Sequence, residues 1–591
     1  MSVQVQIEEQ GVVPVKEEEL ETYDLEVQRF RSGENEPTAF QAYRLREGVY
    51  GQRQPDAQMF RVKIPGGILT AKQLEALADV AGRYALLGKG HITTRENIQF
   101  HHMTLEDAGE AKWRIAKVGL TSREACGNTV RNVVTCPLAG VCRNEAFDVT
   151  PYLTAYVRYF IRKPFTQAMP RKFKTSYSPC PSDCAVAPFH DLGFVAQIRE
   201  VNGELRRGFR MHVGGGSSIM PRVAPVLYDF VPVEEYLRIS EAVLRVFNKS
   251  DEMRKNRMMA RVKVLIDRIG IEAFRELVEK ELQEPWAQEP ADPTEYMLKH
   301  YEKVPPPYQY GNRPEEPGQS EAEFLRWKMT NAVPQRQSGY YAVYLKVAAG
   351  DLSAQQLAVL AELSRRYGNG TARTTAEQNL VLRWVPRHEL HALWKDLSAI
   401  NLGEGGANEI TDVTSCPGTD SCKLGITAAM GAGRALRQSL LDMEIQDPLV
   451  KALHVKVSGC PNGCGRHHLA SIGFQGAAVK GDQGHQVPAY EVYVGGHYED
   501  GDFRYGQRVV QKVPSKRVPE ATQRILALYQ EQRQQDEPFH LFVDRVGLKA
   551  FETVLADLRG ATPMADNLDL YQDWERMEIY KLERGEGECA V

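Results

Sequence analysis

The chain contains two copies of one sequence pattern, and this duplication restricts its fold more than any other feature. Residues 69–84 read LTAKQLEALADVAGRY, and residues 352–367 read LSAQQLAVLAELSRRY. The tetrapeptides GQRQ at 51–54 and PQRQ at 334–337 precede these two segments. Because each copy of a repeat folds as the same unit, we expect two similar halves that face each other across a pseudo-twofold axis.

Each copy predicts a small α+β unit. An alternating strand comes first, as MFRVKIP in one copy and YAVYLKV in the other. A capping residue, Thr70 or Ser353, then begins an amphipathic helix, and a second strand follows as ENIQFH or QNLVLRW. The expected fold class is therefore α+β, an internally duplicated pseudo-dimer of mixed sheets with helices.

The charge balance and the cysteine count limit the class of protein. Lysine and arginine number 73 against 77 aspartates and glutamates, a net charge of −4, so no global basic field indicates a nucleic-acid partner. The first residues lack a basic start followed by an apolar run, and no stretch has the length of a membrane span. We therefore expect a soluble cytoplasmic protein, in which ten cysteines indicate metal or redox chemistry before disulfides.

Four cysteines of the second half have the spacing of a metal site. Cys416 and Cys422 form a Cys-x5-Cys pair, and Cys460 and Cys464 form a Cys-x3-Cys pair. A structural zinc site favours two to four intervening residues. Four thiolates on loops rich in glycine and proline suit a [4Fe-4S] cubane better, since small residues admit the inorganic core. Zinc, or four buried thiols that bind no metal, are the alternatives.

The first half repeats this quartet. Its members lie 280 residues before their counterparts and are Cys136, Cys142, Cys180 and Cys184. Two explanations are open: the first half binds a second cubane, or the thiols are an ancestral relic that is buried and unused.

Four cationic residues occur in the first half only. They are Arg95, Arg131, Lys172 and Lys174. The equivalent positions of the second half hold Glu377, Thr411, Ala452 and His454. This asymmetry indicates that one half supplies the redox centre and the other a cationic pocket for a small anion. Scattered charges on the solvated surface are the alternative.

Together these motifs resemble a known family. HITTRENIQFH, PRKFKTS and VSGCPNGC, with the two cysteine pairs, are similar to segments of the sirohaem- and [4Fe-4S]-dependent sulfite and nitrite reductases, from about residue 44 to residue 544. The resemblance implies that the second-half quartet holds the cubane and that Cys464 is also the axial ligand of the sirohaem iron. It also implies that the four first-half cations bind the substrate anion and help to deliver protons.

The resemblance favours sulfite over nitrite. In the family, lysine at the second position of the Lys-x-Lys pair is typical of sulfite reductases and asparagine of plant-type nitrite reductases, and this chain has Lys174. We therefore expect six-electron reduction of sulfite to sulfide. Reduction of nitrite to ammonia is the alternative, and a non-catalytic iron-sulfur electron carrier is the second. No flavin or nicotinamide motif is evident, so ferredoxin or a separate flavoprotein must donate the electrons.

The chain departs from ordinary members of the family in its first-half cysteines, which those members lack. A second feature is the pair Tyr50 and Cys126, because some members join a tyrosine and a cysteine at such positions by a thioether beside the sirohaem. A free cysteine packed in the core is the alternative.

The repeat and the resemblance predict seven segments. They are an N-terminal extension (1–40), a first ferredoxin-like half-domain (41–110), a first sirohaem- and cluster-type domain (111–283), a linker rich in proline and glutamate (284–330), a second ferredoxin-like half-domain (331–390), a second sirohaem and [4Fe-4S] domain (391–545), and a C-terminal extension (546–591) whose Cys589 is expected to be a free thiol.

Overall fold

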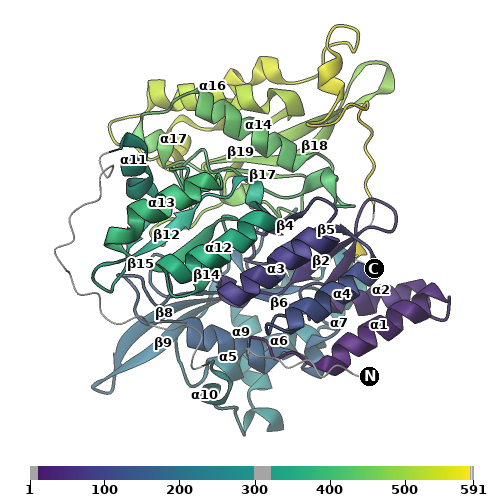
Figure 1. Ribbon diagram of the computed structural model, residues 1–591, viewed down its shortest axis with the longest axis vertical. Helices are drawn as coiled ribbons and strands as arrows, with labels where there is room; N and C mark the ends of the chain where they lie inside the picture. The colour runs from purple at the N-terminus through teal and green to yellow at the C-terminus, as the bar shows by residue number, and fades with distance from the viewer. Residues whose placement is uncertain (1–10, 299–320, 586, 589–591) are drawn as a thin grey trace.

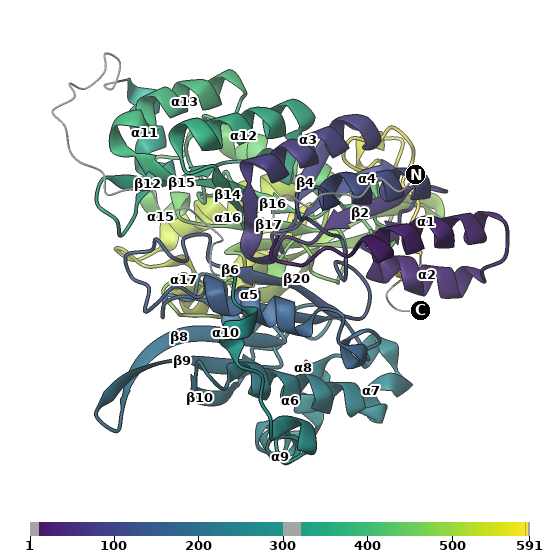
Figure 2. The same cartoon turned by 60° about the horizontal axis from the view of Figure 1, so that its bottom comes forward.

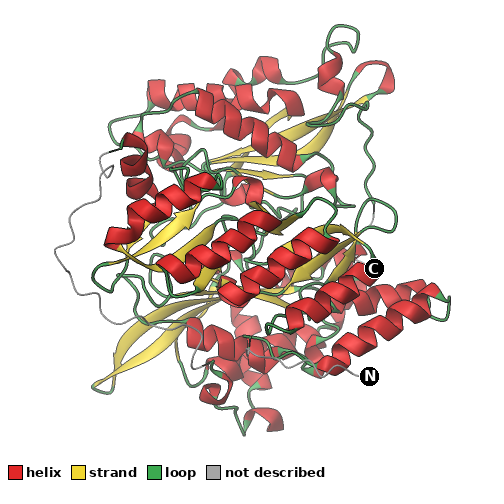
Figure 3. Ribbon diagram, viewed as in Figure 1, coloured by secondary structure: helices red, strands yellow, loops and turns green. Residues whose placement is uncertain are grey.

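The computed structural model describes residues 11–298, 321–585 and 587–588. The central part of the expected linker, at 299–320, and the expected free thiol Cys589 lie outside the described residues. Within the described part, the strands form four five-stranded sheets, two from each half. Figure 3 shows these sheets inside the molecule, with most helices on the outer faces.

The two small units contain the repeated segments 69–84 and 352–367. The first contains β1 (Val49–Gly51), β2 (Gln58–Val62), β4 (Lys89–Ile92), β5 (Ile98–Met103), α3 (Ala71–Tyr84) and α4 (Leu105–Ala116). The second contains β11 (Ala332–Pro334), β12 (Tyr340–Leu345), β14 (Thr371–Thr374), β15 (Leu380–Pro386), α11 (Ala322–Asn331), α12 (Ala354–Tyr367) and α13 (Leu390–Ala399). Thr70 and Ser353 form the capping boxes that begin α3 and α12, as predicted.

The two small units exchange one short strand each. The first-half strand β3 (Ile68–Thr70) pairs with β14, and the second-half strand β13 (Asp351–Ser353) pairs with β4. Figure 1 shows α3 and α12 side by side above the two sheets. One apolar core, with members such as Leu74 and Leu357, therefore runs through both units. The exchange fixes the pseudo-twofold arrangement of the two halves.

Each half continues into a larger unit with one topology. The first is β6 (Val130–Thr135), β7 (Phe173–Ser178), β8 (Leu192–Val201), β9 (Glu204–Val213) and β10 (Val226–Pro232), with α5 (Thr150–Phe160), α6 (Tyr236–Lys249), α7 (Asp251–Lys255), α8 (Val262–Ile269), α9 (Ile271–Glu281) and α10 (Pro293–Tyr296). The second is β16 (Thr414–Ser415), β17 (Val455–Ser458), β18 (Ile472–Lys480), β19 (Gln486–Val494) and β20 (Gln507–Pro514), with α14 (Ala429–Asp442), α15 (Pro448–Lys451), α16 (Val518–Gln532), α17 (Phe539–Val546) and α18 (Leu548–Val554). Figure 2 shows the long β8–β9 hairpin at the edge of the first unit.

The strand directions in the larger units place the cysteines. In each sheet the first three strands are parallel and the remaining pairs are antiparallel. Each cysteine pair lies on the loop that follows the carboxyl end of one of the first two strands. Because the carboxyl ends of parallel strands meet at one edge of a sheet, the two loops of each quartet come together there.

The ends of the chain pack on the first half. Two N-terminal helices, α1 (Glu17–Arg31) and α2 (Pro37–Arg46), lie near α4, and the C-terminal tail returns to the same region (Figure 1). Glu588 in this tail forms a bidentate ion pair with Arg44 at 2.7 and 2.8 Å. Among the helices of the described residues, none combines the length and apolar character that a membrane crossing requires.

Candidate functional site

The four second-half cysteines converge on one space. Burial, and then the nearby thiols of Cys464 and Cys460, raise the pKa of Cys416 well above its usual value. Burial and Cys464 likewise raise the pKa of Cys460 to about 12, and burial and Cys464 raise the pKa of Cys422. Three of these thiols have raised pKa values, so the quartet needs a cation to bind it as thiolates.

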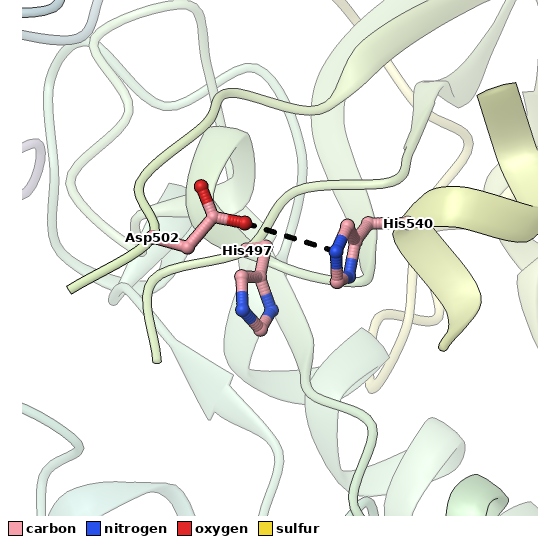
Figure 4. A group of neighbouring side chains, drawn as sticks. All are labelled: His497, Asp502 and His540. Atoms are coloured by element: carbon pink, nitrogen blue, oxygen red, sulfur yellow. Dashed lines mark ion pairs between the residues drawn. The ribbon is translucent and has the colours of Figure 1, made fainter. Parts of the chain in front are cut away.

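The second-half quartet is too open for a single ion. In tetrahedral zinc, Zn–S bonds of about 2.3 Å hold the sulfurs about 3.8 Å apart. Over the described residues, one trio of ligand-type side chains has its ligand atoms within 4.8 Å of one another, and it is His497, Asp502 and His540 (Figure 4). His497 and His540 stack with 4.1 Å between ring centroids, and His540 Nε2 lies 3.8 Å from Asp502 Oδ2; this trio contains none of the cysteines. The quartet therefore suits a larger, polynuclear group.

The backbone around the quartet fits a cluster of that size. The Gly459 amide donates to Cys416 Sγ at 3.2 Å, and Asn462 Nδ2 donates to Cys460 Sγ at 3.5 Å. A Cβ on Gly459 would lie 2.7 Å from the Gly418 Cα, so the two loops approach this closely because residue 459 is a glycine. N–H donors to sulfur are the usual outer partners of a thiolate-bound cluster.

The first half holds the second-half cysteine loop in place. The Arg53 amide donates to the Ser421 carbonyl at 3.0 Å, and Gln54 Nε2 donates to the Asp420 carbonyl at 2.8 Å. Arg53 Nη2 also reaches the Gly425 carbonyl at 2.7 Å. The GQRQ motif thus contacts the loop that carries Cys422, a role that its sequence alone did not reveal.

Lys174 lies near Cys464, and two further predicted cations, Arg95 and Lys172, lie near Lys174. Burial lowers the pKa of Lys174 well below its usual value, and Arg261, Arg95 and Lys172 lower it further, while the Cys464 thiol opposes them. Lys174 belongs to β7, and Arg95 begins the turn before β5. Positive charge from the first half therefore lies near a cysteine of the second half.

Two further cations continue the positively charged region: Arg95 lies near Lys174, and Arg131 lies near Arg95. Burial, and then Arg466, lower the pKa of Arg95 to about 9, and Arg131 contributes to the same shift. Arg95 Nη2 donates to the Asn132 carbonyl, and its buried Nε has no hydrogen-bond partner. Arg131 donates to the Gly127 carbonyl at 2.8 Å and so points toward the loop that precedes β6.

Cations this close together repel one another, and bound anions would relieve that repulsion. Asp191 forms an ion pair with Arg261 at 2.8 Å and so neutralises one of them. Cys464 is exposed and Lys174 is half-buried, so solvent reaches both; we call the space between them the recess. These residues fit a sirohaem with a small anion beside it. The Cys464 thiol can ligate iron, the nearby cations can bind carboxylates, and the unpaired Arg95 Nε can donate to an anion.

Sequence reasoning missed three residues of this recess: Arg261, Arg466 and His190. Arg466 lies two residues after Cys464, and its Nη2 donates to the Thr94 carbonyl at 2.6 Å. Burial, and then Arg95 and Arg466, lower the pKa of His190 well below its usual value. Neither Arg261 nor His190 belongs to a recognisable motif, so their proximity emerges only from the fold.

Tyr50 and Cys126 lie in one small apolar cluster, which also includes Leu45 and Met59. Arg61 Nη1 donates to Cys126 Sγ at 3.6 Å. A covalent bond between Tyr50 and Cys126 stays a prediction.

Two family profiles match the chain, each of them twice. "Nitrite and sulphite reductase 4Fe-4S domain" fits residues 126–286 and 406–560, and "Nitrite/Sulfite reductase ferredoxin-like half domain" fits residues 50–118 and 333–400. The duplicated α+β units, the four-cysteine centre and the cationic recess thus define an oxidoreductase that acts on small anions. The chain belongs to the nitrite and sulfite reductase family, which confirms the resemblance and the fold class expected from the sequence.

Individual relatives carry both substrate names. An "Assimilatory ferredoxin-dependent nitrite reductase" of Haloferax mediterranei is 31% identical, over 85% of this chain and 84% of its own. A "Sulfite reductase [ferredoxin]" of Mycobacterium tuberculosis is 30% identical, over 82% of each chain. The solved structure of the Mycobacterium tuberculosis NirA protein has a TM-score of 0.75 and 26% identity, covering 90% of this chain and 95% of that one.

Proposed function

We propose that the protein reduces sulfite to sulfide. The reaction adds six electrons and six protons to sulfite and releases sulfide and three waters. The observation that carries the choice of substrate is the position of Lys174, which lies beside Cys464 with Arg95 and Lys172 around it. A second ammonium favours a dianion over a monoanion such as nitrite, because each positive charge gains more from two negative charges than from one.

In this proposal the second-half quartet holds one [4Fe-4S] cluster, and Cys464 also ligates the iron of sirohaem. Sirohaem, when bound, supplies the iron at which the anion is reduced and the coupling to the cluster. The protein residues bind and orient the anion and exclude competing ligands. Asp191 neutralises Arg261, whereas Lys174 and Arg95 lie beside each other and would meet the carboxylates and the substrate.

Lys174 can also supply a proton. A group whose pKa is lowered gives up its proton more readily near neutral pH, and burial lowers the pKa of Lys174 well below its usual value. Arg95, Arg131 and Arg466 keep the recess positive after that proton has left. We propose ferredoxin as the electron donor, supported by the donor named in both relatives. A separate flavoprotein is the alternative.

Visible spectroscopy tests the reductase assignment. Purified protein should show sirohaem bands above the broad cluster absorbance, and sulfite should shift these bands. An electron carrier without tetrapyrrole would show neither. A spectrum without sirohaem bands, after expression in cells that make sirohaem, would contradict the proposal.

The Lys174→Asn variant tests the substrate. We expect kcat/KM for sulfite to fall by about 100-fold and that for nitrite by less than about 10-fold, because the variant removes a charge that the dianion needs more. Lys172→Asn is the matched control and should lower both reductions to a similar extent. Both activities are measured with reduced methyl viologen. An unchanged ratio in Lys174→Asn would remove the basis for choosing sulfite over nitrite.

A further inference from the structure

We propose that the first-half quartet binds a second [4Fe-4S] cluster, and that no tetrapyrrole accompanies it. The four thiols come from the loops after β6 and β7 and are Cys136, Cys142, Cys180 and Cys184. None of these four forms a disulfide. The inference goes beyond sulfite reduction and does not depend on which anion is the substrate.

The first-half loops have the same internal hydrogen bonds as the second-half loops. The Cys142 amide donates to the Leu138 carbonyl at 2.8 Å, as Cys422 does to Gly418 at 3.0 Å. After the next pair, the Ala185 amide donates to Ser178 Oγ at 3.2 Å, and its counterpart, Gly465, donates to the equivalent serine at 3.1 Å. Loops of one shape therefore present both quartets.

The opposite half holds the first-half loop as well. The Arg336 amide donates to the Val141 carbonyl at 2.8 Å, and Gln337 Nε2 donates to the Gly140 carbonyl at 3.3 Å. These residues belong to PQRQ, the counterpart of the GQRQ motif that contacts the loop of Cys422. A relic without function would have no need to keep this reciprocal contact.

The loop keeps its shape at a conformational cost. Val186 has φ of 53°, and its counterpart Arg466, two residues after Cys464, has φ of 62°. The left-handed region is unfavourable for a β-branched residue, so the surrounding structure must impose it. In both halves an exposed cysteine, Cys184 or Cys464, stands two residues before this left-handed position.

The thiols themselves are close together. Cys184 interacts with Cys136 and Cys180, and Cys180 interacts with Cys142; contact with Cys136 raises the pKa of Cys184 well above its usual value. The Arg383 guanidinium donates to the Ala139 carbonyl at 2.9 Å within the same loop. Four thiolates and a cubane carry net negative charge, which this buried cation offsets.

The two larger units also differ at one position near the cysteine loops, where one half has a small residue and the other a large one. Gly214 and Gly495 make the same backbone bond to the end of the preceding loop, at 2.9 and 3.0 Å. Three residues after these glycines stand Ser217 and Tyr498. In the first-half loop the small Ser217 packs against Gly463, beside Cys464. Near the first-half quartet, the larger Tyr498 stands at the position equivalent to Ser217 and packs against the cluster that contains Val186.

Charge reinforces this difference between the two recesses. Where the catalytic recess has Arg95, its counterpart has Glu377, which pairs with Lys456 and hydrogen-bonds to Tyr498. Against the effect of burial, Lys456 and Arg466 lower the pKa of Glu377 to about 2, so it is anionic. Glu377 engages Lys456 and Arg466, so fewer positive charges remain on this side for a polycarboxylate such as sirohaem, whereas a cubane enclosed by its own thiolates needs none of them.

Metal analysis of the full chain, purified without oxygen, tests the inference. We expect about nine irons and about eight acid-labile sulfides per sirohaem; a single cluster gives about five and four. In the reduced protein, the second cluster should give a paramagnetic signal that is not coupled to sirohaem. Five irons with full sulfite reduction would overturn the second cluster and leave the proposed function intact. Nine irons without turnover would overturn the function alone.

Matched serine variants assign the iron to each quartet. Cys142→Ser should lose about four irons and the uncoupled signal while keeping the sirohaem bands. Cys422→Ser, at the equivalent position, should keep the uncoupled signal. Two other outcomes would overturn the proposal: one zinc per chain in the first half, or a mass lower by about 2 Da per disulfide in a chain without extra iron.

Discussion

At the residue scale, the repeat supplies its own comparison for a buried carboxyl. Glu96 accepts a hydrogen bond from the Thr135 amide at 3.2 Å, and Gln378 accepts the equivalent bond from the Ser415 amide at 2.9 Å. Both residues have left-handed backbones, with φ of 59° and 68°. Burial raises the pKa of Glu96 from 4.5 to about 8, although its structural task is one that a neutral amide performs in the other half.

We predict that Glu96→Gln removes part of the pH dependence of stability. Between pH 4.5 and about 8 the folded protein keeps a proton on Glu96 that the unfolded chain has lost, so wild-type stability falls as the pH rises through this window. At pH 9 the variant should be more stable by about 1–2 kcal/mol, and at pH 4.5 nearly unchanged. Unfolding midpoints of the holoenzyme at both pH values measure this.

The reciprocal variant is the control. Gln378→Glu should introduce a new loss of stability as the pH rises from the ordinary pKa of a glutamate to the raised pKa of the buried carboxyl, because it places an ionisable group at the equivalent enclosed position. Parallel pH profiles for wild type and Glu96→Gln would contradict the interpretation.

The same scale separates what sequence can and cannot predict about the site. The cysteines and Lys174 stand in short motifs whose spacing is visible along the chain. Arg261 and His190 have no motif, and their proximity to the recess follows from packing of β7, β8 and α8. Spacing identifies ligands, but burial decides which other charges join them.

At the element scale, long periodic segments were predictable and short exchanged ones were not. The strands and capped helices of both small units agree with the alternating and amphipathic patterns. The strands β3 and β13 have three residues each, too few to establish a period, and their partners lie in the other half. The sequence pattern could therefore predict similar units without revealing the exchange.

The C-terminal tail is an element whose contacts the sequence left open. Tyr580 Oη donates to the Ile426 carbonyl at 2.9 Å, and the Gly585 amide donates to the Lys423 carbonyl at 2.9 Å, so the tail covers the loop that carries Cys422. Glu588 then joins Lys423, at 2.9 Å, to Arg44. The tail thus connects the loop that carries Cys422 to α2 of the first half through ion pairs.

We predict that Glu588→Gln loosens this loop. The variant leaves the buried Arg44 and the half-buried Lys423 with a neutral acceptor and should lower the free energy of unfolding by about 1–3 kcal/mol. Hydrogen exchange of the Lys423 and Gly425 amides should speed up in parallel. The control is Glu583→Gln on the same tail, whose carboxylate is 75% exposed and 4.0 Å from Arg53, so little change is expected. Equal exchange in both variants would contradict the role of Glu588.

At the scale of the whole molecule, each half is incomplete without the other. The exchanged strands complete each other's sheets, and one apolar core spans the two small units. Each cysteine loop is held by the opposite half, through Gln54 on one side and Gln337 on the other. Duplication predicted two similar halves; this mutual dependence follows from contacts that no sequence pattern encodes.

We predict that cutting the chain within 299–320 leaves one particle with both halves. A protease site inserted there should yield two fragments that elute together in gel filtration and keep the sirohaem bands, because no contact described between the halves is cut. Residues 321–591 expressed alone should retain little iron, since Arg53 and Gln54 would be missing from the loop of Cys422. Co-expression of both fragments is the control and should restore the holoenzyme. Independent folding of residues 321–591 with a full cluster would show that each half holds its own cofactors, and the reciprocal contacts would then contribute only to the packing of the halves.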